Sequence, residues 1–320
     1  MECLDSETVL DTLLRNEVVV PYSCRSGHCQ SCLLQASKGD VDERAQKGLK
    51  DTFREQNYFL ACQCVPVEDL HLVSPVDAEL YEHAVVREKT MLAETICRLV
   101  IEPAMPLYYH AGQFINLRKY NGLVRSYSLA SLPQTDSCLE LHIKRFNNGR
   151  MSQWLIDELD IGQSLEIQGP YGTCYYSSND AQQNLLLIGT GTGLAPLIGI
   201  VKDALHSKHQ GKIILYHGSR NISGLYYQDV LAAIEQRFPQ FQYHSCLSGE
   251  SVPQGVLSGR AHDIAMRQHN NLQAWNVYLC GDPAMVAAAK KMAYLAGARL
   301  SNIYADPFEL TDLRKVPRTN

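Results

Sequence analysis

Four cysteines have the spacing of a metal centre. Cys24, Cys29 and Cys32 stand in a C-x4-C-x2-C pattern within one loop, and Cys62 follows in a second short segment. Plant-type two-iron, two-sulfur clusters have this spacing, because four thiolates are needed to hold two iron ions bridged by sulfide. Gly27 lets the loop take a tight path, so that backbone N–H groups can point at the sulfurs. We therefore predict a 2Fe-2S cluster with these four ligands.

The chain has eleven cysteines, more than the predicted cluster uses. A structural zinc site is the alternative use of the four, although zinc ligands usually come as two closely spaced pairs. A strand would turn Cys64 away from the cluster, and His28 on the cluster loop is expected to be an exposed bystander. Five further cysteines are predicted to be small buried hydrophobes: Cys3, Cys97, Cys138, Cys174 and Cys246.

A second group of residues has the types that suit a flavin. Arg125, Tyr127 and Ser128 lie in one short run, and Gly149 opens a helix predicted over residues 151–159. A guanidinium can pair with a pyrophosphate, an aromatic ring can stack on an isoalloxazine, and a hydroxyl can hydrogen-bond near its N5. The free N–H groups at the start of the helix suit a second phosphate, which favours FAD over FMN. By itself, the first run would also fit a surface strand.

A glycine-rich turn and a strand-end cysteine suit a nucleotide. The segment GTGTGLAP, residues 189–196, follows an apolar strand and opens a helix, so backbone amides can approach a pyrophosphate. The segment CGDP, residues 280–283, ends another buried strand, and ligands of open parallel sheets sit beyond the carboxyl ends of the strands. A plain turn and a buried structural cysteine are the alternatives.

Three segments with different sequence patterns must position these motifs. Residues 1–79 hold fourteen acidic and seven basic side chains. Residues 80–178 contain short apolar runs separated by turn residues, the spacing of an antiparallel barrel or sandwich. Residues 179–310 alternate buried strands with helices, which predicts a parallel sheet covered on both faces. Residues 311–320 are expected to be a frayed tail. We therefore predict a multidomain protein.

The start of the first segment predicts a helix and a strand. Asp5 or Ser6 can cap a helix, because the apolar residues between Val9 and Leu14 fall on one face at helical spacing. A short strand is expected over residues 18–20, before the cysteine loop.

Composition excludes several classes of function. The formal net charge is −5 and the pI is about 6.1, so no basic patch for nucleic acid is expected. The longest apolar stretch, residues 185–201, is broken by glycines and a proline and is shorter than the ~20 residues of a membrane span. The start has no secretory leader and the thiols are clustered, so we expect a cytoplasmic protein. We also expect no membrane anchor, and we expect a monomer.

Together the motifs resemble one enzyme family. Their order, over nearly the whole chain, is similar to that of the ferredoxin-NADP reductase superfamily. The similarity is to the form with an N-terminal plant-type ferredoxin fused to an FAD/NAD reductase, as in benzoate dioxygenase reductase-like components of oxygenases. The resemblance implies an α+β ferredoxin domain of the β-grasp type, an antiparallel β-barrel that binds FAD, and an α/β parallel-sheet domain that binds the nucleotide.

The resemblance also assigns residues to the site. It implies that Ser128, Cys280 and Phe308 lie at the reaction centre, with Cys280 beside the nicotinamide and Phe308 over the flavin. The implied flavin residues are Arg125, Tyr127, Ser128, His142, Lys144, Gly149, Met151 and Ser152. The implied nucleotide residues are Gly189, Thr190, Gly191, Thr192, Gly193, Ser219, Arg220, Cys280, Gly281 and Asp282.

Some features depart from the family or leave alternatives. Twelve residues follow Phe308, whereas relatives end soon after their aromatic, so core packing is the alternative for this side chain. Related ferredoxin domains begin with a hairpin that Met1–Leu4 are too short to supply, so either the sheet is trimmed or the given start is internal. Arg220 could hold a 2′-phosphate, stack, or face solvent. NADH is expected from the relatives, with NADPH as the alternative.

The resemblance implies an NADH-dependent electron-transfer reductase. Electrons would pass from NADH to FAD, then singly to the 2Fe-2S cluster and on to a partner, expected to be a ring-hydroxylating dioxygenase component. A diiron monooxygenase or a CDP-deoxyglucoseen-type dehydratase is the alternative partner. Two other classes are also considered: a non-turnover zinc or redox-sensing module, and a simple flavin reductase that releases reduced flavin.

Overall fold

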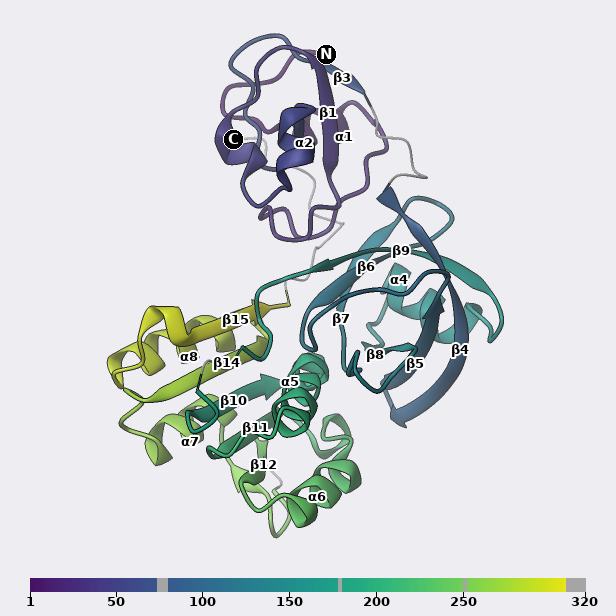
Figure 1. The fold of residues 1–320 in the computed structure, drawn as a ribbon. Coiled ribbons are helices and arrows are strands. Elements are labelled where there is room, and N and C mark those ends of the chain that lie inside the picture. The colour runs from purple at the N-terminus through teal and green to yellow at the C-terminus, as the bar shows by residue number, and fades with distance from the viewer. Residues whose placement is uncertain (74–79, 178–179, 250–251, 309–320) are drawn as a thin grey trace.

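Three separate sheets organise the chain into three domains (Figure 1). The computed structural model describes residues 1–73, 80–177, 180–249 and 252–308. In Figure 1 the first domain lies at the top, the barrel below it on the right, and the parallel-sheet domain at the lower left. The predicted boundary residues 79 and 178 and the predicted tail lie outside the described residues. Among the described residues, no helix is both long enough and apolar enough to cross a bilayer.

The first domain packs short helices against a small antiparallel sheet with the strand order β2-β1-β3. Thr8 caps its first helix by accepting a hydrogen bond from the backbone of Asp11, so the predicted caps Asp5 and Ser6 are wrong. The strand predicted over residues 18–20 is also wrong, because the residues before the helix form no strand that could pair with it. The elements are α1 (Val9–Arg15), β1 (Leu33–Lys38), η1 (Glu43–Gln46), α2 (Asp51–Glu55), β2 (Tyr58–Leu60) and β3 (His71–Val73).

The second domain is a six-stranded antiparallel barrel. Its strand order is β7-β6-β9-β4-β5-β8, and an isolated bridge between Leu129 and Leu141 joins the two edge strands and closes it. The helix predicted over 151–159 is present as α4 (Arg150–Gln153) followed by the π-helical turn η2 (Trp154–Glu158). The strands are β4 (Glu82–Ala93), β5 (Ile96–Pro103), β6 (Phe114–Arg118), β7 (Val124–Ser128), β8 (Leu139–Lys144) and β9 (Ser164–Tyr171).

The third domain is a parallel sheet with the strand order β13-β12-β11-β10-β14-β15. The first strand in sequence, β10, therefore lies between β11 and β14, and the crevice at such a reversal of strand order is where open α/β sheets bind ligands. The strands are β10 (Asn184–Thr190), β11 (Ile213–Ser219), β12 (Phe241–Leu247), β13 (Leu257–Ser258), β14 (Trp275–Gly281) and β15 (Ile303–Pro307). Of these, β13 and β15 were not predicted from the sequence.

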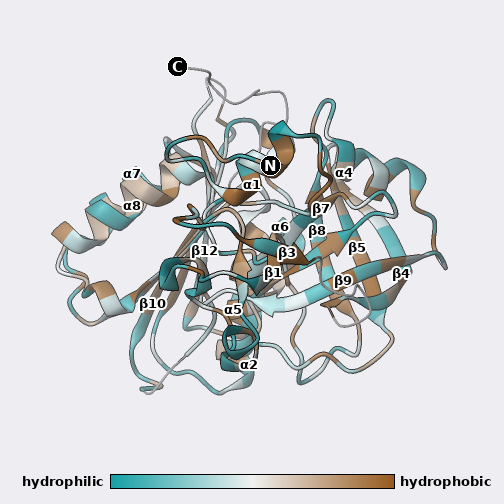
Figure 2. Cartoon of the chain, turned by 90° about the horizontal axis from the view of Figure 1, so that it is seen from above, coloured by the Kyte–Doolittle hydropathy of each residue, from teal (hydrophilic) through white to brown (hydrophobic). Residues whose placement is uncertain are grey.

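Helices cover both faces of this sheet, as its continuous apolar strands predict. Alternate residues of β10 enter two different cores: Leu185 and Leu187 pack beneath α5 and α6, and Leu186 and Ile188 pack beneath α7 and α8. Helices α7 and α8 carry both hydrophilic and hydrophobic residues (Figure 2), as helices with one buried face do. Their bounds are α5 (Leu194–His206), α6 (Gln228–Arg237), α7 (Ala261–Gln268) and α8 (Pro283–Leu295).

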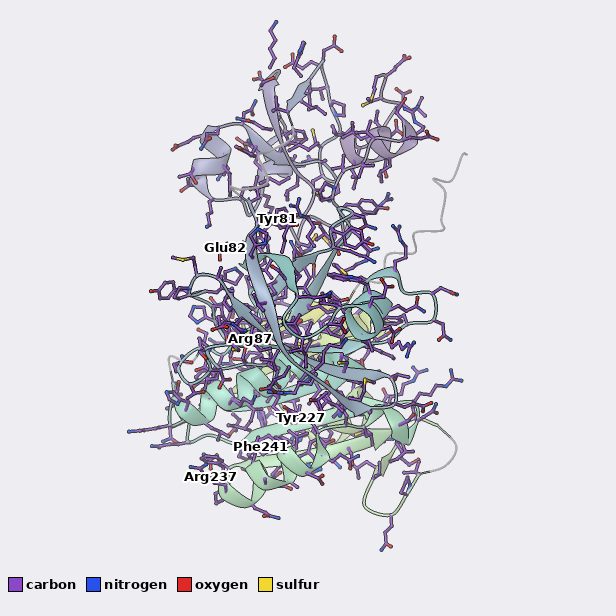
Figure 3. All side chains as sticks on the ribbon, turned by 90° about the vertical axis from the view of Figure 1, so that its right-hand side faces the viewer. Tyr81, Glu82, Arg87, Tyr227, Arg237 and Phe241 are labelled. Carbon is purple, nitrogen blue, oxygen red and sulfur yellow. The ribbon has the colours of Figure 1, made fainter. Side chains whose placement is uncertain are left out.

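Specific contacts join the domains. The side-chain amide of Asn116, on β6 of the barrel, donates a buried 2.7 Å hydrogen bond to the carbonyl oxygen of Cys29. Within the barrel, the guanidinium of Arg118 lies 3.9 Å from the ring centre of Tyr81, which Figure 3 places at the start of β4, below the first domain. The core beneath α5 also includes Ile96 and other barrel residues, so the barrel and the parallel sheet share one hydrophobic core.

Candidate functional site

A single cavity of about 1200 Å³ is lined by all three domains. It contains nearly every motif that the sequence singled out, although these motifs are far apart in the chain. The first domain contributes the cluster loop, the barrel contributes the end of β7 and the start of α4, and the third domain contributes the glycine turn and the end of β15. Among the lining residues are Cys24, Cys29, Arg125, Tyr127, Ser128, Met151, Thr192, Asp306 and Phe308.

The four predicted cluster cysteines lie together as two pairs. The thiols of Cys24 and Cys29 are in hydrogen-bond contact, as are those of Cys32 and Cys62. A two-iron cluster needs two thiolates for each iron, and the paired arrangement of the four cysteines supplies them.

Backbone amides surround these sulfurs, as the predicted tight loop requires. The N–H groups of Ser26 and Cys29 donate to the sulfur of Cys24 at 3.4 and 3.3 Å, and the N–H of Cys24 donates to the sulfur of Cys29 at 3.4 Å. The N–H of Gly27 donates to Cys62, and Gly27 has a φ of +81°, which few other residues adopt. Such amides stabilise the negative charge that a cluster gains on reduction.

The remaining cysteine predictions are confirmed in part. Cys64 is buried in the core of the first domain, and His28 is exposed. Cys97, Cys174 and Cys246 are buried as predicted. The prediction is wrong for Cys3 and Cys138, which are only partly buried because they lie near the chain start and in a surface turn.

Arg125 is a cation that lacks an anionic partner within the described protein. Its guanidinium donates only to carbonyl oxygens, those of Val124 at 2.6 Å and Tyr22 at 3.4 Å. Burial lowers the pKa of Arg125, since its charge is poorly solvated, and the nearby Arg150 adds to this effect. A half-buried cation that has no counter-ion among the described residues and lines a cavity fits the pyrophosphate of FAD, as the sequence predicts.

Ser128 reaches across the domain boundary to a carboxylate that the sequence analysis did not assign. Its hydroxyl donates a 3.2 Å hydrogen bond to Asp306, on β15 of the parallel-sheet domain. Burial raises the pKa of Asp306 to about 6. In the sheet, Asp306 lies opposite the buried Cys280, while Asp306 and Ser128 both line the cavity. A carboxyl of raised pKa in a cavity is a candidate functional group, and no motif in the sequence indicates it.

Three further residues predicted to bind the flavin also line the cavity, and the hydroxyl of one of them is already bonded to the protein. Lys144 and Met151 line it. Ser152 also lines it, but its hydroxyl accepts from the backbone of Phe146 and donates to Gly149, so it braces the turn before α4. A Cβ on Gly149 would collide with this hydroxyl, which explains the glycine.

His142 has both ring nitrogens occupied by protein. Nδ1 lies 2.9 Å from the hydroxyl of Tyr226 and Nε2 lies 3.0 Å from a carboxylate oxygen of Glu140, which also accepts from Tyr227. Only its ring carbons are left for a cofactor. Its polar atoms link the barrel to the parallel-sheet domain, a contact between residues far apart in sequence that the LHIK motif does not reveal.

The glycines of the predicted nucleotide turn allow the chain to approach very closely. A Cβ on Gly193 would overlap the carbonyl of Cys280, and one on Gly281, whose φ is +118°, would lie 2.6 Å from the hydroxyl of Thr190. That hydroxyl accepts a 3.0 Å hydrogen bond from the backbone of Asp282. The turn is therefore packed directly against the end of β14, at the crevice where the strand order reverses.

Several predicted nucleotide residues also have structural tasks. Asp282 caps α8 by accepting a 2.9 Å hydrogen bond from the backbone of Met285, so its carboxylate is engaged. The hydroxyl of Ser219 donates to the carbonyl of Asn221. Arg220 is exposed beyond the end of β11 and makes no ion pair with a described residue. Their contacts with a nucleotide stay predictions.

Phe308 and Cys280, which are both predicted to lie at the reaction centre, differ in how deeply they are buried. Phe308 is half-buried and lines the cavity, and its backbone N–H donates a 2.7 Å hydrogen bond to Gly281, so it does not pack into a core. Cys280 is fully buried, and its sulfur lies 3.6 Å from that of Cys174 in the loop after β9 of the barrel. The sequence did not indicate this pair.

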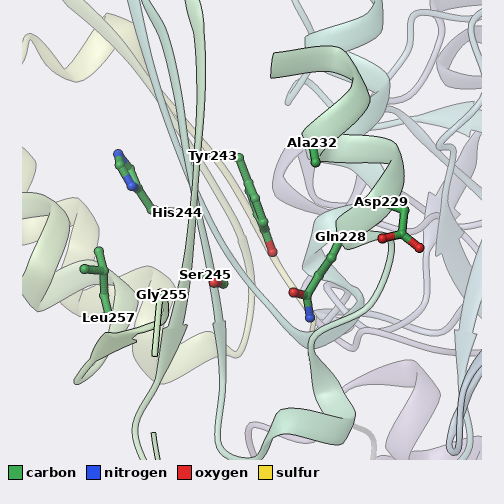
Figure 4. A pocket seen from close by; sticks show the side chains of 8 residues that line it. All are labelled: Gln228, Asp229, Ala232, Tyr243, His244, Ser245, Gly255 and Leu257. Carbon is green, nitrogen blue, oxygen red and sulfur yellow. The ribbon is translucent and has the colours of Figure 1, made fainter. Parts of the chain in front are cut away.

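A second, smaller cavity of about 360 Å³ lies beside β12 and α6. Figure 4 shows Tyr243 and Gln228 facing each other across it. None of the predicted site residues lines this cavity. The chemistry therefore belongs to the larger cavity.

Three family models match consecutive parts of the chain. A 2Fe-2S iron-sulfur cluster binding domain matches residues 1–67, an oxidoreductase FAD-binding domain matches residues 82–176, and an oxidoreductase NAD-binding domain matches residues 187–291. Fold and site thus define an NAD(P)H-dependent iron–sulfur flavoprotein oxidoreductase with a 2Fe-2S cluster and FAD. The three-domain prediction is confirmed.

Curated relatives extend over almost the entire chain. The ferredoxin–NAD(P)(+) reductase component of naphthalene 1,2-dioxygenase/salicylate 5-hydroxylase systems from Ralstonia sp. is 34% identical over 94% of this chain and 93% of its own length. The reductase subunit of aromatic O-demethylase from Amycolatopsis sp. is 35% identical, over 91% and 90%. The crystal structure of an Amycolatopsis cytochrome P450 reductase has a TM-score of 0.72 at 33% identity and covers 96% of both chains. The chain belongs to the family of oxygenase reductase components in which a 2Fe-2S ferredoxin domain is fused to FAD- and NAD-binding domains.

Proposed function

We propose that this protein is an NADH-dependent reductase, active in the cytoplasm, that passes electrons singly to a ring-hydroxylating dioxygenase component. The observation that carries the proposal is the shared cavity, which is lined by residues of the cluster loop, the flavin motif and the nucleotide turn. When bound, FAD supplies the change from two-electron to one-electron chemistry. The names of the relatives from dioxygenase systems, including the naphthalene 1,2-dioxygenase reductase component of Pseudomonas putida at 30% identity, support the acceptor.

The residues of the chain have separate tasks in this proposal. Arg125 holds the FAD pyrophosphate, and Tyr127 stacks on the ring system. Ser128 and Asp306 face the reacting edge of the flavin, where a hydroxyl and a carboxyl of raised pKa can hold a proton. Phe308 excludes water from the flavin until the nicotinamide takes its place.

The cluster loop completes the path. Asn116 ties the backbone of Cys29 to the barrel, so the predicted cluster is held beside the same cavity as the flavin motif. Fixed, short separation is what electron transfer requires from the polypeptide, and a simple flavin reductase would need no such contact. Retention of FAD and of cluster absorbance through gel filtration tests this against release of free flavin.

A second acceptor has a specific observation in its favour. The aromatic O-demethylase reductase subunit is as similar to this chain as the dioxygenase reductases are, and the cytochrome P450 reductase shares its whole fold. A cytochrome P450 is thus the rival acceptor, ahead of the dehydratase, which no relative named above supports. A phenol hydroxylase P5 protein at 30% identity and the reductase component of a phenol 2-monooxygenase at 31% identity keep a monooxygenase in consideration.

A reconstitution experiment separates these acceptors. The purified reductase would be mixed with NADH and, in turn, with a ring-hydroxylating dioxygenase, a diiron phenol hydroxylase and an O-demethylating P450, and product formation per NADH would be measured. Our proposal expects tight coupling only with the dioxygenase. Coupling to the P450 with uncoupled NADH oxidation in the dioxygenase mixture would contradict it.

The choice of NADH is tested at Arg220. An exposed cation without an ion pair to a described residue can bind a 2′-phosphate, and we propose NADH as the electron donor. We expect a higher kcat/KM for NADH than for NADPH, with Arg220→Ala affecting only the weak NADPH reaction. If Arg220→Ala lowers kcat/KM for NADPH and NADPH is the better substrate of the wild type, the nucleotide assignment is wrong.

A further inference from the structure

Two buried thiols from different domains meet behind the cavity wall. The sulfurs of Cys174 and Cys280 are 3.6 Å apart. Cys174 is 3% exposed and Cys280 is 0% exposed, and both belong to the core shared by the barrel and the parallel sheet. A disulfide has an S–S length of about 2.05 Å, so these atoms need to move by only ~1.5 Å to bond.

The backbone holds both residues in place. A Cβ on Gly112 would lie 2.6 Å from the carbonyl oxygen of Cys174, and a Cβ on Gly193 would overlap the carbonyl of Cys280. These contacts are closer than any side chain permits, so glycine is required on each side. The two sulfurs are therefore brought together by fixed main chains.

The two thiols differ in access to solvent. Cys174 lines the large cavity, whereas Cys280 does not. Burial and the contact with Cys174 raise the pKa of Cys280 well above its usual value, so that thiol stays protonated. A small oxidant entering the cavity meets Cys174 first, and Cys280 is placed to resolve the product.

We propose that Cys174 and Cys280 form a dithiol site that hydrogen peroxide oxidises to a disulfide, which blocks flavin reduction by NADH. The sulfur of Cys174 attacks one peroxide oxygen, the O–O bond breaks, and a sulfenic acid and one water form. The sulfur of Cys280 then attacks that sulfur, the S–O bond breaks, and hydroxide leaves with the Cys280 proton as a second water. In total, two thiols lose two electrons and one peroxide becomes two waters.

The consequence follows from the position of Cys280. The disulfide would tie the end of β14, where the nicotinamide is placed by our proposed function, to the loop after β9. A displacement of reacting groups by ~1 Å can cost ~100-fold in rate, so the rate constant of flavin reduction should fall by about tenfold or more. The inhibition rests on the proposed function, but formation of the bond does not.

Peptide mapping tests the bond. Holoprotein is treated with hydrogen peroxide, free thiols are alkylated, and a tryptic digest is analysed without reduction. Residues 151–202 and 268–290 form two tryptic peptides that hold one cysteine each, Cys174 and Cys280. We expect these peptides linked, and separated again by dithiothreitol. Recovery of both as alkylated thiols, or as sulfinic and sulfonic acids without a link, would overturn the proposal.

Stopped-flow reduction of the bound flavin by NADH tests the consequence, with each variant compared to its own untreated sample. Wild type should slow after peroxide and recover with dithiothreitol. Cys174→Ser and Cys174→Ala should show no reversible slowing. Cys97→Ser, which removes a buried barrel thiol that donates to Arg98, should behave as wild type. A linked peptide pair with unchanged flavin reduction would refute the inhibition and would mean that the nicotinamide binds elsewhere. Formation of the disulfide between Cys174 and Cys280 would still be confirmed.

Discussion

The side-chain amide of Asn116 and the carbonyl oxygen of Cys29 form a buried 2.7 Å hydrogen bond between the barrel and the first domain. Asn116 lies opposite Ser126 in the β6–β7 ladder, between Arg125 and Tyr127 of the flavin motif. Its Oδ1 accepts from Ser126, and its amide also donates to Gln168. One side chain thus connects a cluster ligand to the strand that carries the flavin residues.

Replacing this amide should slow electron transfer from the flavin to the cluster. Asn116→Ala leaves a buried carbonyl unsatisfied, a loss of ~1–3 kcal/mol of stability at the interface. We expect slower reduction of the cluster by the flavin in stopped-flow absorbance, with NADH reduction of the flavin little changed. Gln46→Ala is the matched control, since the side-chain amide of Gln46 donates to the carbonyl of Tyr58 within the first domain. Equal slowing in both variants would mean general destabilisation.

Removal of one cluster ligand should abolish the reduction of cytochrome c but retain NADH-to-ferricyanide activity. Cys29→Ser should lose the cluster absorbance and the reduction of cytochrome c, because the thiolate pair with Cys24 is broken. NADH-to-ferricyanide activity, which needs only the flavin, should remain largely intact. Cys64→Ala, which removes a buried thiol close in sequence but outside the ligand set, should retain both. Loss of both activities in Cys29→Ser would contradict the division of tasks between domains.

Arg125→Ala should weaken FAD binding. Hydrogen bonds to charged groups contribute about 1.5–3 kcal/mol, so the Kd for FAD should rise by roughly 10- to 100-fold. The flavin content of purified protein and fluorescence titration of the flavin-free form measure it. Arg87→Ala, an exposed charge change on β4 where Arg87 pairs with Glu102, is the control (Figure 3). Unchanged FAD occupancy would remove Arg125 from the pyrophosphate site.

The fully buried His217 should make stability depend on pH. Its Nε2 lies 3.1 Å from the carbonyl of Gly191 in the nucleotide turn, and burial lowers the pKa of His217 to about 4. The unfolded chain binds this proton near pH 6.5, so folding stability falls as pH drops from about 6.5 to about 4, by on the order of 2–3 kcal/mol. His217→Gln, which can still donate to Gly191, should lose that part of the slope in urea unfolding. His71→Gln, at an exposed histidine of β3, should keep it. Identical slopes in the wild type and His217→Gln would show that His217 is not the group responsible.

Local sequence patterns determined the ligands and the elements. The four cluster cysteines, the barrel strands and the alternating strands and helices of the third domain follow from spacing and periodicity, because each depends on residues close together in the chain. Errors occurred where a partner was required: residues 18–20 have strand composition but no neighbouring strand, and Thr8 caps α1 although Asp5 and Ser6 are also capping residues.

Tertiary structure alone decided how the centres meet. Ser128 and Asp306 are 178 residues apart in sequence, Cys174 and Cys280 are 106 apart, and Asn116 and Cys29 are 87 apart. No periodicity or spacing relates positions at such separations, since these contacts arise only when three independently patterned domains pack together. The sequence therefore predicts which residues would hold each cofactor, whereas the packing of the domains creates the cavity, raises the pKa of Asp306 and brings the two thiols within 3.6 Å of each other.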